Sequence, residues 1–323
     1  MFDQVPISWN DVSRTADKGV HVPDLDALST TEAQNPRTRR LDAMSVEELL
    51  RVMNAEDARV PDAVARQIPQ IARAVELVVQ ALRAGGRLIY LGAGTSGRLG
   101  VLDAAECPPT FGTDPGQVVG LLAGGQGAMF RAAEGAEDRA QDGVRDLTEL
   151  GLTDRDVVVG IAASGRTPYV IGGLDHARAA GAATVSIACN PGAEVSRHAQ
   201  VAIELDNGPE VLTGSTRLKA GTSQKLVLNM ISTAAMVGLG KVYGNLMVDL
   251  RPTNEKLLAR AVRIVREATD CDEDTARAAL AAADHHAKTA IVAILCGISA
   301  DAARDRLAAA DGFVRGAVDT TPH

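Results

Sequence analysis

Five short apolar runs, separated by segments with helical spacing, constrain the fold of this 323-residue chain more than any other feature. Short, continuously apolar strands are typical of parallel sheets that helices cover on both faces. We therefore predict an α/β fold with a doubly wound, mostly parallel five-stranded sheet, in which ligands bind at the carboxyl ends of the strands. The predicted strands are 88–91, 118–122, 157–161, 183–188 and 201–205.

Helical patterns flank the predicted sheet on both sides. Ser45 and Glu48 form the S-x-x-E pattern of a capping box, which predicts a helix through about Asn54. Apolar spacing predicts two longer helices, one over 61–84 and one over 225–242. The second of these lacks proline and is apolar enough to be buried.

An alanine-rich segment near the C-terminus predicts a separate helical domain. Residues 269–318 have the spacing of three short helices, with caps at Asp274–Thr275 and at Ser299 and a stop at Gly297. The expected division of the chain is a loose N-terminal arm (1–30), a sheet domain with flanking helices (31–265), and a small helical domain with the tail (266–323).

Composition places the chain among soluble cytoplasmic enzymes that act on small molecules. The net charge is −8 and only 2% of the residues are aromatic, which disfavours nucleic acid as a partner. No segment has the apolar length of a membrane span or of a secretion signal, so we expect no membrane partner. Four widely spaced cysteines indicate a reduced compartment, and the adjacent His285 and His286 lack the i,i+4 spacing of a metal pair, so we expect no metal. The cysteines are Cys107, Cys189, Cys271 and Cys296.

The first apolar run leads into a glycine-rich turn with the spacing G-x-G-x-x-G, from Gly92 to Gly97. A helix that starts in this turn presents free backbone N–H groups, which attract an anion. Dinucleotide-binding folds share the spacing, but they carry an acidic residue at the end of the second strand, where this chain has alanine and glycine. The G-K-[ST] of a P-loop is also missing. Thr95 and Ser96 therefore favour a phosphate ester over a dinucleotide.

A second turn repeats this chemistry after the third apolar run, where 163–168 reads Ala-Ser-Gly-Arg-Thr-Pro. Because the two turns follow neighbouring strands, we expect them to form one cup for a phosphate, with the N–H groups of Gly97 and Gly165 as backbone donors. Alternatively, these residues are ordinary turn and cap residues. The predicted ligands are Gly94, Thr95, Ser96, Gly97, Ser164, Gly165, Arg166 and Thr167, with Lys219 as a further cation.

Longer motifs narrow the class of phosphate ester. The most distinctive reads Glu-Cys-Pro-Pro-Thr-Phe-Gly over 106–112. Together the motifs resemble the N-acetylmuramic acid 6-phosphate etherases, a family of the flavodoxin-like sugar isomerase (SIS) superfamily, and the resemblance spans 31–307. The segments that carry it are 31–36, 88–125, 134–138, 162–168, 214–230, 244–249 and 253–256.

The resemblance implies a reaction and the residues that perform it. The family cleaves the ether between D-lactate and carbon 3 of the sugar 6-phosphate, which leaves N-acetylglucosamine 6-phosphate. By resemblance, Glu106 is the proton donor and Glu137 is the base at carbon 2. The resemblance also implies a homodimer with sites near the subunit interface, a small UBA-like helical domain at the C-terminus, and no cofactor.

Two carboxylates suit the cleavage of such an ether. In the open-chain sugar the carbon 2 proton is α to the aldehyde and the lactyl oxygen is β to it, so a base and an acid in different environments can perform an elimination. Glu106 lies among apolar and proline residues, which predicts burial and a raised pKa, although a structural carboxylate that caps a turn fits the same pattern. Glu137 lies among charged residues, as on a solvated helix face.

Two other functions share the phosphate cup. A phosphosugar isomerase is one, but related isomerases usually carry a hydroxyl residue where this chain has Ala162. The other is a non-catalytic phosphosugar-sensing regulator that resembles the glucokinase regulatory protein. A regulator has no need of the acid–base pair, whereas this chain has both Glu106 and Glu137.

Overall fold

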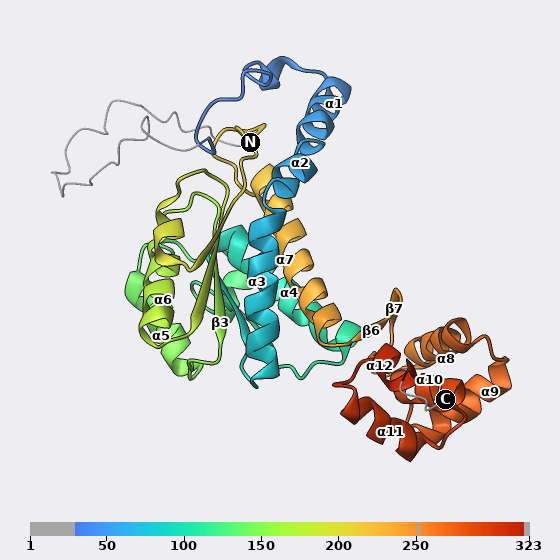
Figure 1. The fold of residues 1–323 in the computed structure, drawn as a ribbon. Helices are drawn as coiled ribbons and strands as arrows, with labels where there is room; N and C mark the ends of the chain where they lie inside the picture. The colour runs from blue at the N-terminus through green and yellow to red at the C-terminus, as the bar shows by residue number, and fades with distance from the viewer. Residues whose placement is uncertain (1–29, 251, 253, 320–323) are drawn as a thin grey trace, which may run out of the picture.

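The computed structural model describes residues 30–250, 252 and 254–319. Its larger body is built on a parallel five-stranded sheet, and Figure 1 shows this body with helices on both sides of the sheet. The strand order is β2-β1-β3-β4-β5, which confirms the predicted α/β fold. Every residue of β1 and β3 is buried, as expected for strands covered on both faces. The strands are β1 (Leu88–Gly92), β2 (Val118–Leu122), β3 (Val157–Ala162), β4 (Ala183–Ala188) and β5 (Val201–Glu204).

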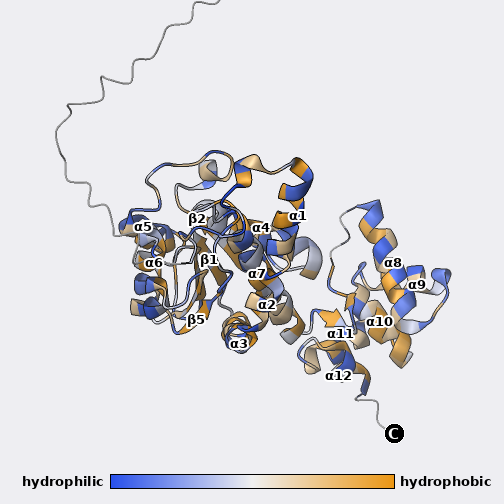
Figure 2. Cartoon of the chain, turned by 90° about the horizontal axis from the view of Figure 1, so that it is seen from above, coloured by the Kyte–Doolittle hydropathy of each residue, from blue (hydrophilic) through white to orange (hydrophobic). Residues whose placement is uncertain are grey.

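Helices cover the two faces of the sheet as separate layers (Figure 1). On one face α3 (Ile68–Arg83) and α4 (Gly94–Phe111) both pack against α7 (Lys219–Gly238), and on the other α5 (Ala140–Glu149) packs against α6 (Pro168–Ala179). Alternate residues of each strand therefore enter different cores. Figure 2 shows the hydrophobic strands enclosed between the helices.

The N-terminal helices differ from the expected single helix over 61–84. The Ser45 capping box is present, and it starts α1 (Val46–Asp57) as predicted. Two helices follow, α2 (Val60–Ala65) and α3, with a break between them. Pro69 explains the break, because proline has no N–H to donate to the carbonyl of Ala65 and its ring clashes with that carbonyl.

Helix α7 begins six residues earlier than the predicted start at Lys225. Its capping group is the Glu210 carboxylate, which accepts hydrogen bonds from the backbone N–H of Lys219 at 3.1 Å and of Ala220 at 2.9 Å. The cap lies nine residues before the helix, so no local capping motif marks this helix start.

The C-terminal residues form a second, helical body with its own core, which lies beside the sheet domain (Figures 1 and 2). Four helices, and not the predicted three, occupy 269–318, and Asp272 caps the first of them in place of Asp274–Thr275. The core also takes in Val248 and Ala261, which lie before the expected domain boundary at 265. The elements are β6 (Val242–Tyr243), β7 (Leu246–Met247), α8 (Glu255–Thr269), α9 (Glu273–Ala282), α10 (Ala287–Cys296), α11 (Ala300–Ala309) and α12 (Val314–Asp319).

Three short 3-10 helices complete the described chain, at Leu41–Ala43, Gln126–Met129 and Glu194–His198. None of the helices that the structure describes combines the length and the apolar character needed to cross a bilayer.

Candidate active site at the carboxyl ends of the strands

The glycine-rich turn after β1 forms the start of α4. Ala93 is the N-cap and makes no side-chain cap, so the first helical turn, with Thr95 and Ser96, keeps backbone N–H groups that have no partner inside the helix. Gly97 differs from the expectation, because its N–H already donates to Ala93 O at 3.2 Å. A Cβ on Gly97 would lie 2.4 Å from Gly92 O. Gly97 therefore serves the close contact of helix and strand, and its N–H is not a free donor.

The second turn lies beside the first, because β1 and β3 pair in register with Gly92 opposite Ile161. Gly165 has a φ of +76°, and its N–H donates to Ala162 O at 3.0 Å, so the expectation of a free N–H is wrong here too. The hydroxyl of Thr167 makes no cap bond at the start of α6. The turn that contains Ser164 and Thr167 thus lies beside the turn that starts α4.

A third segment closes on the same place from α7. A Cβ placed on Gly221 would lie 3.5 Å from Thr95 Cγ2 and 3.7 Å from Thr216 O, so the start of α7 and the loop before it lie beside Thr95. Gln224, one turn further along α7, is fully buried and accepts a hydrogen bond from Ser96 Oγ at 2.9 Å. The sequence motifs contained these residues, but no spacing rule assigned them to the site.

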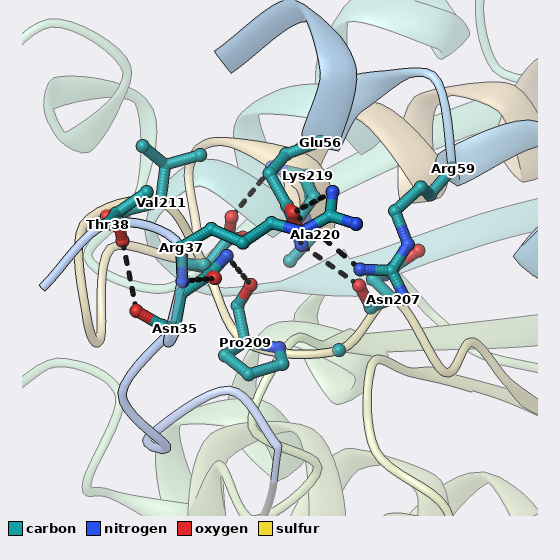
Figure 3. Close-up of polar contacts among 12 residues, drawn as sticks. Asn35, Arg37, Thr38, Glu56, Arg59, Asn207, Pro209, Val211, Lys219 and Ala220 are labelled. Carbon is teal, nitrogen blue, oxygen red and sulfur yellow. Dashed lines mark hydrogen bonds and ion pairs between the residues drawn. The ribbon is translucent and has the colours of Figure 1, made fainter. Parts of the chain in front are cut away.

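Lys219 does not face this site, which corrects its expected role as a ligand cation. Its side chain is 0% exposed, and Nζ donates to Glu56 Oε2 at 2.6 Å and to Asn207 O at 3.0 Å (Figure 3). Burial favours the neutral form of Glu56, but the hydrogen bond and charge of Lys219, with help from Asn35 and Arg59, outweigh it and lower the pKa of Glu56. Lys219 therefore ties α1 to α7.

A cavity of about 340 Å³ opens at the N-terminus of α4 and contains Glu137 in its lining. Glu137 lies in the loop before α5 and not on a helix face, and its backbone oxygen accepts a hydrogen bond from Tyr169 N at 3.0 Å. This contact fixes the loop to the start of α6. The remaining lining includes Gly94 and Arg98 of α4 and the segment 132–136. Glu137 and the open helix terminus thus share one cavity.

Glu106 is exposed, and the expected burial of its carboxyl group is wrong for a single copy of the chain. Its neighbours Ala104 and Cys107 are buried because they lie on the inner face of α4, while Glu106 lies on the outer face. Ten residues separate it from Ser96, a rise of about 15 Å along the helix. Within one chain Glu106 therefore lies far from the phosphate turns.

A buried polar cluster holds α4 in place against β1 and α7. The Asp103 carboxylate accepts hydrogen bonds from Tyr90 OH at 2.8 Å, Asn229 Nδ2 at 2.7 Å and Ser232 Oγ at 3.2 Å. Burial and the nearby Asp103 charge raise the pKa of Tyr90 well above its usual value, so Tyr90 stays a hydrogen-bond donor. This cluster fixes the position of α4 and with it that of Glu106.

Among the residues that the structure describes, cysteines and metal-binding side chains form no cluster. All four cysteines are free, as the sequence predicted. Within the described part of the chain no three His, Cys, Asp or Glu side chains lie together as a metal site would need. His286 instead contacts Asp249 Oδ1 at 3.1 Å and Thr289 Oγ1 at 2.7 Å inside the helical domain.

Comparisons with protein families agree with this architecture. Residues 70–178 match the glucokinase regulatory protein N-terminal SIS domain, 141–234 match the SIS domain, and 244–290 match the C-terminal lid domain of glucokinase regulatory protein. A phosphoheptose isomerase of Neisseria gonorrhoeae is 18% identical with a TM-score of 0.47, covering 59% of this chain and 98% of its own. The sheet order, the turns at its carboxyl edge and the matches to the family models define an SIS-domain protein.

Curated relatives identify the family within this class. The chain is 63% identical to the N-acetylmuramic acid 6-phosphate etherase of Mycolicibacterium smegmatis, over 91% of this chain and 99% of the relative. It is 62% identical to N-acetylmuramic acid 6-phosphate etherase 2 of Lactiplantibacillus plantarum, over 90% and 98%. The Pectobacterium atrosepticum etherase is 58% identical, over 89% and 95%. The chain belongs to the N-acetylmuramic acid 6-phosphate etherase family.

Proposed function

We propose that this protein cleaves the D-lactyl ether of N-acetylmuramic acid 6-phosphate, giving N-acetylglucosamine 6-phosphate and D-lactate in amino sugar catabolism and peptidoglycan recycling. The observation that carries the proposal is the cavity at the N-terminus of α4, which places the Glu137 carboxylate beside an open helix terminus. The names of relatives at about 60% identity support the same reaction, whereas nothing in them favours the isomerase or the regulator.

The phosphate binds at the two adjacent turns. Hydroxyl groups of Thr95, Ser164 and Thr167 donate to its oxygens, and the free N–H groups in the first turn of α4 add donors and the positive end of the helix dipole. The Ser96 hydroxyl already donates to Gln224 Oε1, so Ser96 contributes through its backbone N–H. Arg166 adds a positive charge. Its Nε is buried and has no hydrogen-bond partner among the described residues, so this group is free to donate to the phosphate. Binding through these groups holds carbon 6 at the carboxyl edge of the sheet.

Elimination of lactate and addition of water then replace the lactyl ether at carbon 3 with a hydroxyl group. Glu137 takes the carbon 2 proton of the open-chain sugar, the electron pair forms the carbon 2–carbon 3 double bond, and the carbon 3–oxygen bond breaks as Glu106 protonates the leaving lactate. Water adds at carbon 3 in the reverse sense: it gives a proton to Glu106, and carbon 2 takes a proton from Glu137 after the exposed carboxyl group has exchanged it with solvent. The two steps together involve no net oxidation or reduction of the substrate, and neither step consumes a cofactor.

Glu106 acts in the site of a second copy of the chain, so the enzyme is a homodimer. Within one copy the rise of about 15 Å from Ser96 exceeds the span between the phosphate and carbon 3 of the sugar. An exposed apolar groove of about 860 Å³ between α3 and α7 offers a face for the second copy on the same side of the sheet as α4. Its exposed apolar side chains include Ile68, Met230 and Val237.

The reaction is tested by D-lactate release from N-acetylmuramic acid 6-phosphate. Wild type should release D-lactate, while Glu106→Gln and Glu137→Gln should release almost none. In labelled water the product should carry solvent deuterium at carbon 2 and solvent oxygen at carbon 3. Purified protein that binds the sugar phosphate but releases no D-lactate would refute the function, and a product without solvent oxygen at carbon 3 would refute the mechanism.

Mixing the two inactive variants tests the shared site. In a dimer of one Glu106→Gln copy and one Glu137→Gln copy, one of the sites has both native glutamates if Glu106 acts across the interface. Random mixing should then restore about a quarter of wild-type activity, because about half the dimers are mixed. If both glutamates act within one copy, mixing restores nothing.

The protein acts in the cytoplasm under this proposal. Its four free cysteines suit a reducing compartment, in which disulfides are rare.

A further inference from the structure

The cavity at the N-terminus of α4 is lined by a cationic side chain, Arg98, that the reaction above does not use. Arg98 lies at the start of the second turn of α4 and lines this cavity together with Gly94 and Glu137. Its Nε donates to Met129 O at 3.1 Å, and its Nη2 donates to Ala128 O at 2.7 Å. These two bonds hold the guanidinium group against the segment that leads to Glu137.

The positive charge of Arg98 is not neutralised by these contacts. Both acceptors are uncharged backbone carbonyls, and Nη1 takes part in neither bond. In the part of the chain that the structure describes, no carboxylate lies within ion-pair distance of Arg98. The other charged groups of the cavity lining are the carboxylates of Glu134 and Glu137, so an anionic ligand needs this cation.

The chemistry of the substrate says which anion lies there. The substrate has a phosphate on carbon 6 and a second anion, the lactyl carboxylate, on the oxygen of carbon 3. Carbon 3 is bonded to carbon 2, whose proton Glu137 removes. A group that binds the lactyl carboxylate must therefore lie near Glu137, whereas a group that binds the phosphate lies at the other end of the sugar.

We propose that Arg98 binds the carboxylate of the lactyl group and so selects 3-O-carboxyalkyl ethers of hexosamine phosphates over hexosamine phosphates that lack this group. This assignment rests on the proposed function. The free Nη1, with the charge of the whole guanidinium, makes a charge-assisted hydrogen bond to the carboxylate while Nε and Nη2 stay on the loop.

Arg166 provides the contrast, since it lies in the turn after β3 with Ser164 and Thr167. Its Nε is buried and has no hydrogen-bond partner within the described ranges, which suits an anion at the phosphate end of the sugar. The two arginines thus match the two anions of the substrate. Substitution of Arg98 should therefore weaken binding of the lactyl carboxylate, whereas substitution of Arg166 should weaken binding of the phosphate.

Calorimetric titration of two ligands separates these roles. Glu137→Gln serves as the background, because it stops turnover and lets the intact substrate be titrated beside N-acetylglucosamine 6-phosphate. Adding Arg98→Gln should weaken substrate binding about 10- to 100-fold, the range for one charge-assisted hydrogen bond, and change product binding less than about twofold. Arg98→Lys, which keeps the charge, should restore part of the substrate affinity. Arg166→Gln should weaken binding of both ligands alike.

Several outcomes would overturn the role of Arg98. If Arg98→Gln loses affinity for both ligands equally, the residue only supports the loop. If it loses affinity for neither ligand, the residue contacts neither of them. Arg131→Gln removes an exposed cation from the same segment and should change neither affinity. The proposed function fails separately, if wild type releases no D-lactate, whatever the titrations give.

Discussion

The two long helices α4 and α7 begin at the same edge of the sheet but treat their N-termini in opposite ways. At α4 the N-cap is Ala93, no side chain of the described residues caps the first turn, and the terminus opens into a cavity. At α7 the Glu210 carboxylate takes the first N–H groups, and Lys219 is buried in an ion pair with Glu56. The same helix dipole is neutralised by the protein at α7 and left for an external anion at α4.

The difference teaches which polar groups at this edge are structural. Both termini carry the small and hydroxyl residues that suggest anion binding, since Ala220, Gly221 and Thr222 at α7 resemble Gly94 and Thr95 at α4. The Glu210 carboxylate, nine residues before the start of α7, distinguishes them. Residue types mark both helix starts alike, and tertiary contacts decide which of them stays open.

The largest effect is expected at the closed terminus. Lys219→Met should lower the free energy of unfolding by about 3–5 kcal/mol, because it leaves the buried Glu56 carboxylate without its main partner. Urea unfolding measures the change. Lys225→Met, on the exposed face of the same helix, should change stability by less than about 0.5 kcal/mol. Equal effects of the two variants would mean that the buried pair does not hold α7.

A smaller, pH-dependent part of this stability belongs to Glu56. Its pKa lies below the ordinary 4.5, so the folded state gains stability from the ionised carboxylate above that pH and loses it as pH falls through the lowered pKa. The stability difference between wild type and Glu56→Gln should therefore shrink from about pH 6 to about pH 3. Thermal unfolding across this range measures it, and a constant difference would contradict the linkage.

Much of the fold follows from local pattern, because each predicted strand is a short apolar run that packs the same way in any doubly wound sheet. The strands agree with prediction to within one residue at each end, and the capping box at Ser45 is present. The break between α2 and α3 also has a local cause, because Pro69 cannot continue α2. The fold was predictable where neighbours in sequence determine the structure.

The site was less predictable, because it depends on contacts between distant segments. Glu106 was expected to be buried because its sequence neighbours are apolar, yet those neighbours turn inward while Glu106 turns outward. Lys219 was expected near the ligand, but its partner Glu56 is 163 positions away. Glu137 remains a prediction, and its place in the cavity depends on a loop whose path no periodicity describes.

At the open terminus a methyl group should be enough to disturb the contact of α4 with β1. Gly97→Ala places its Cβ 2.4 Å from Gly92 O, and backbone cannot yield as a flexible side chain does, so we expect a loss of about 1–3 kcal/mol. Phosphosugar affinity should fall with it, because the first turn of α4 shifts. Gly116→Ala, which meets no atom within 4 Å, is the matched control and should change stability little. Unchanged unfolding of Gly97→Ala would contradict the close contact.

The smallest change in the free energy of unfolding is expected for Thr95→Val, which should nevertheless weaken ligand binding clearly. Together with Thr222→Val, it tests the contrast between the two helix termini directly. Thr95→Val keeps the shape and the methyl group that faces α7 but removes the hydroxyl at the open terminus. Stability should change by less than about 0.5 kcal/mol, while affinity for N-acetylglucosamine 6-phosphate should fall about tenfold, as expected for one lost hydrogen bond to a charged group.

Thr222→Val makes the same change at the closed terminus, where the hydroxyl donates to Leu218 O at 3.0 Å. It should leave both stability and affinity near wild type. If Thr222→Val weakens binding as much as Thr95→Val, the α7 terminus also contacts the ligand, and the two helix starts differ less than their caps indicate. If neither variant weakens binding, the phosphate lies away from the first turn of α4, and the turn after β3 must bind it alone.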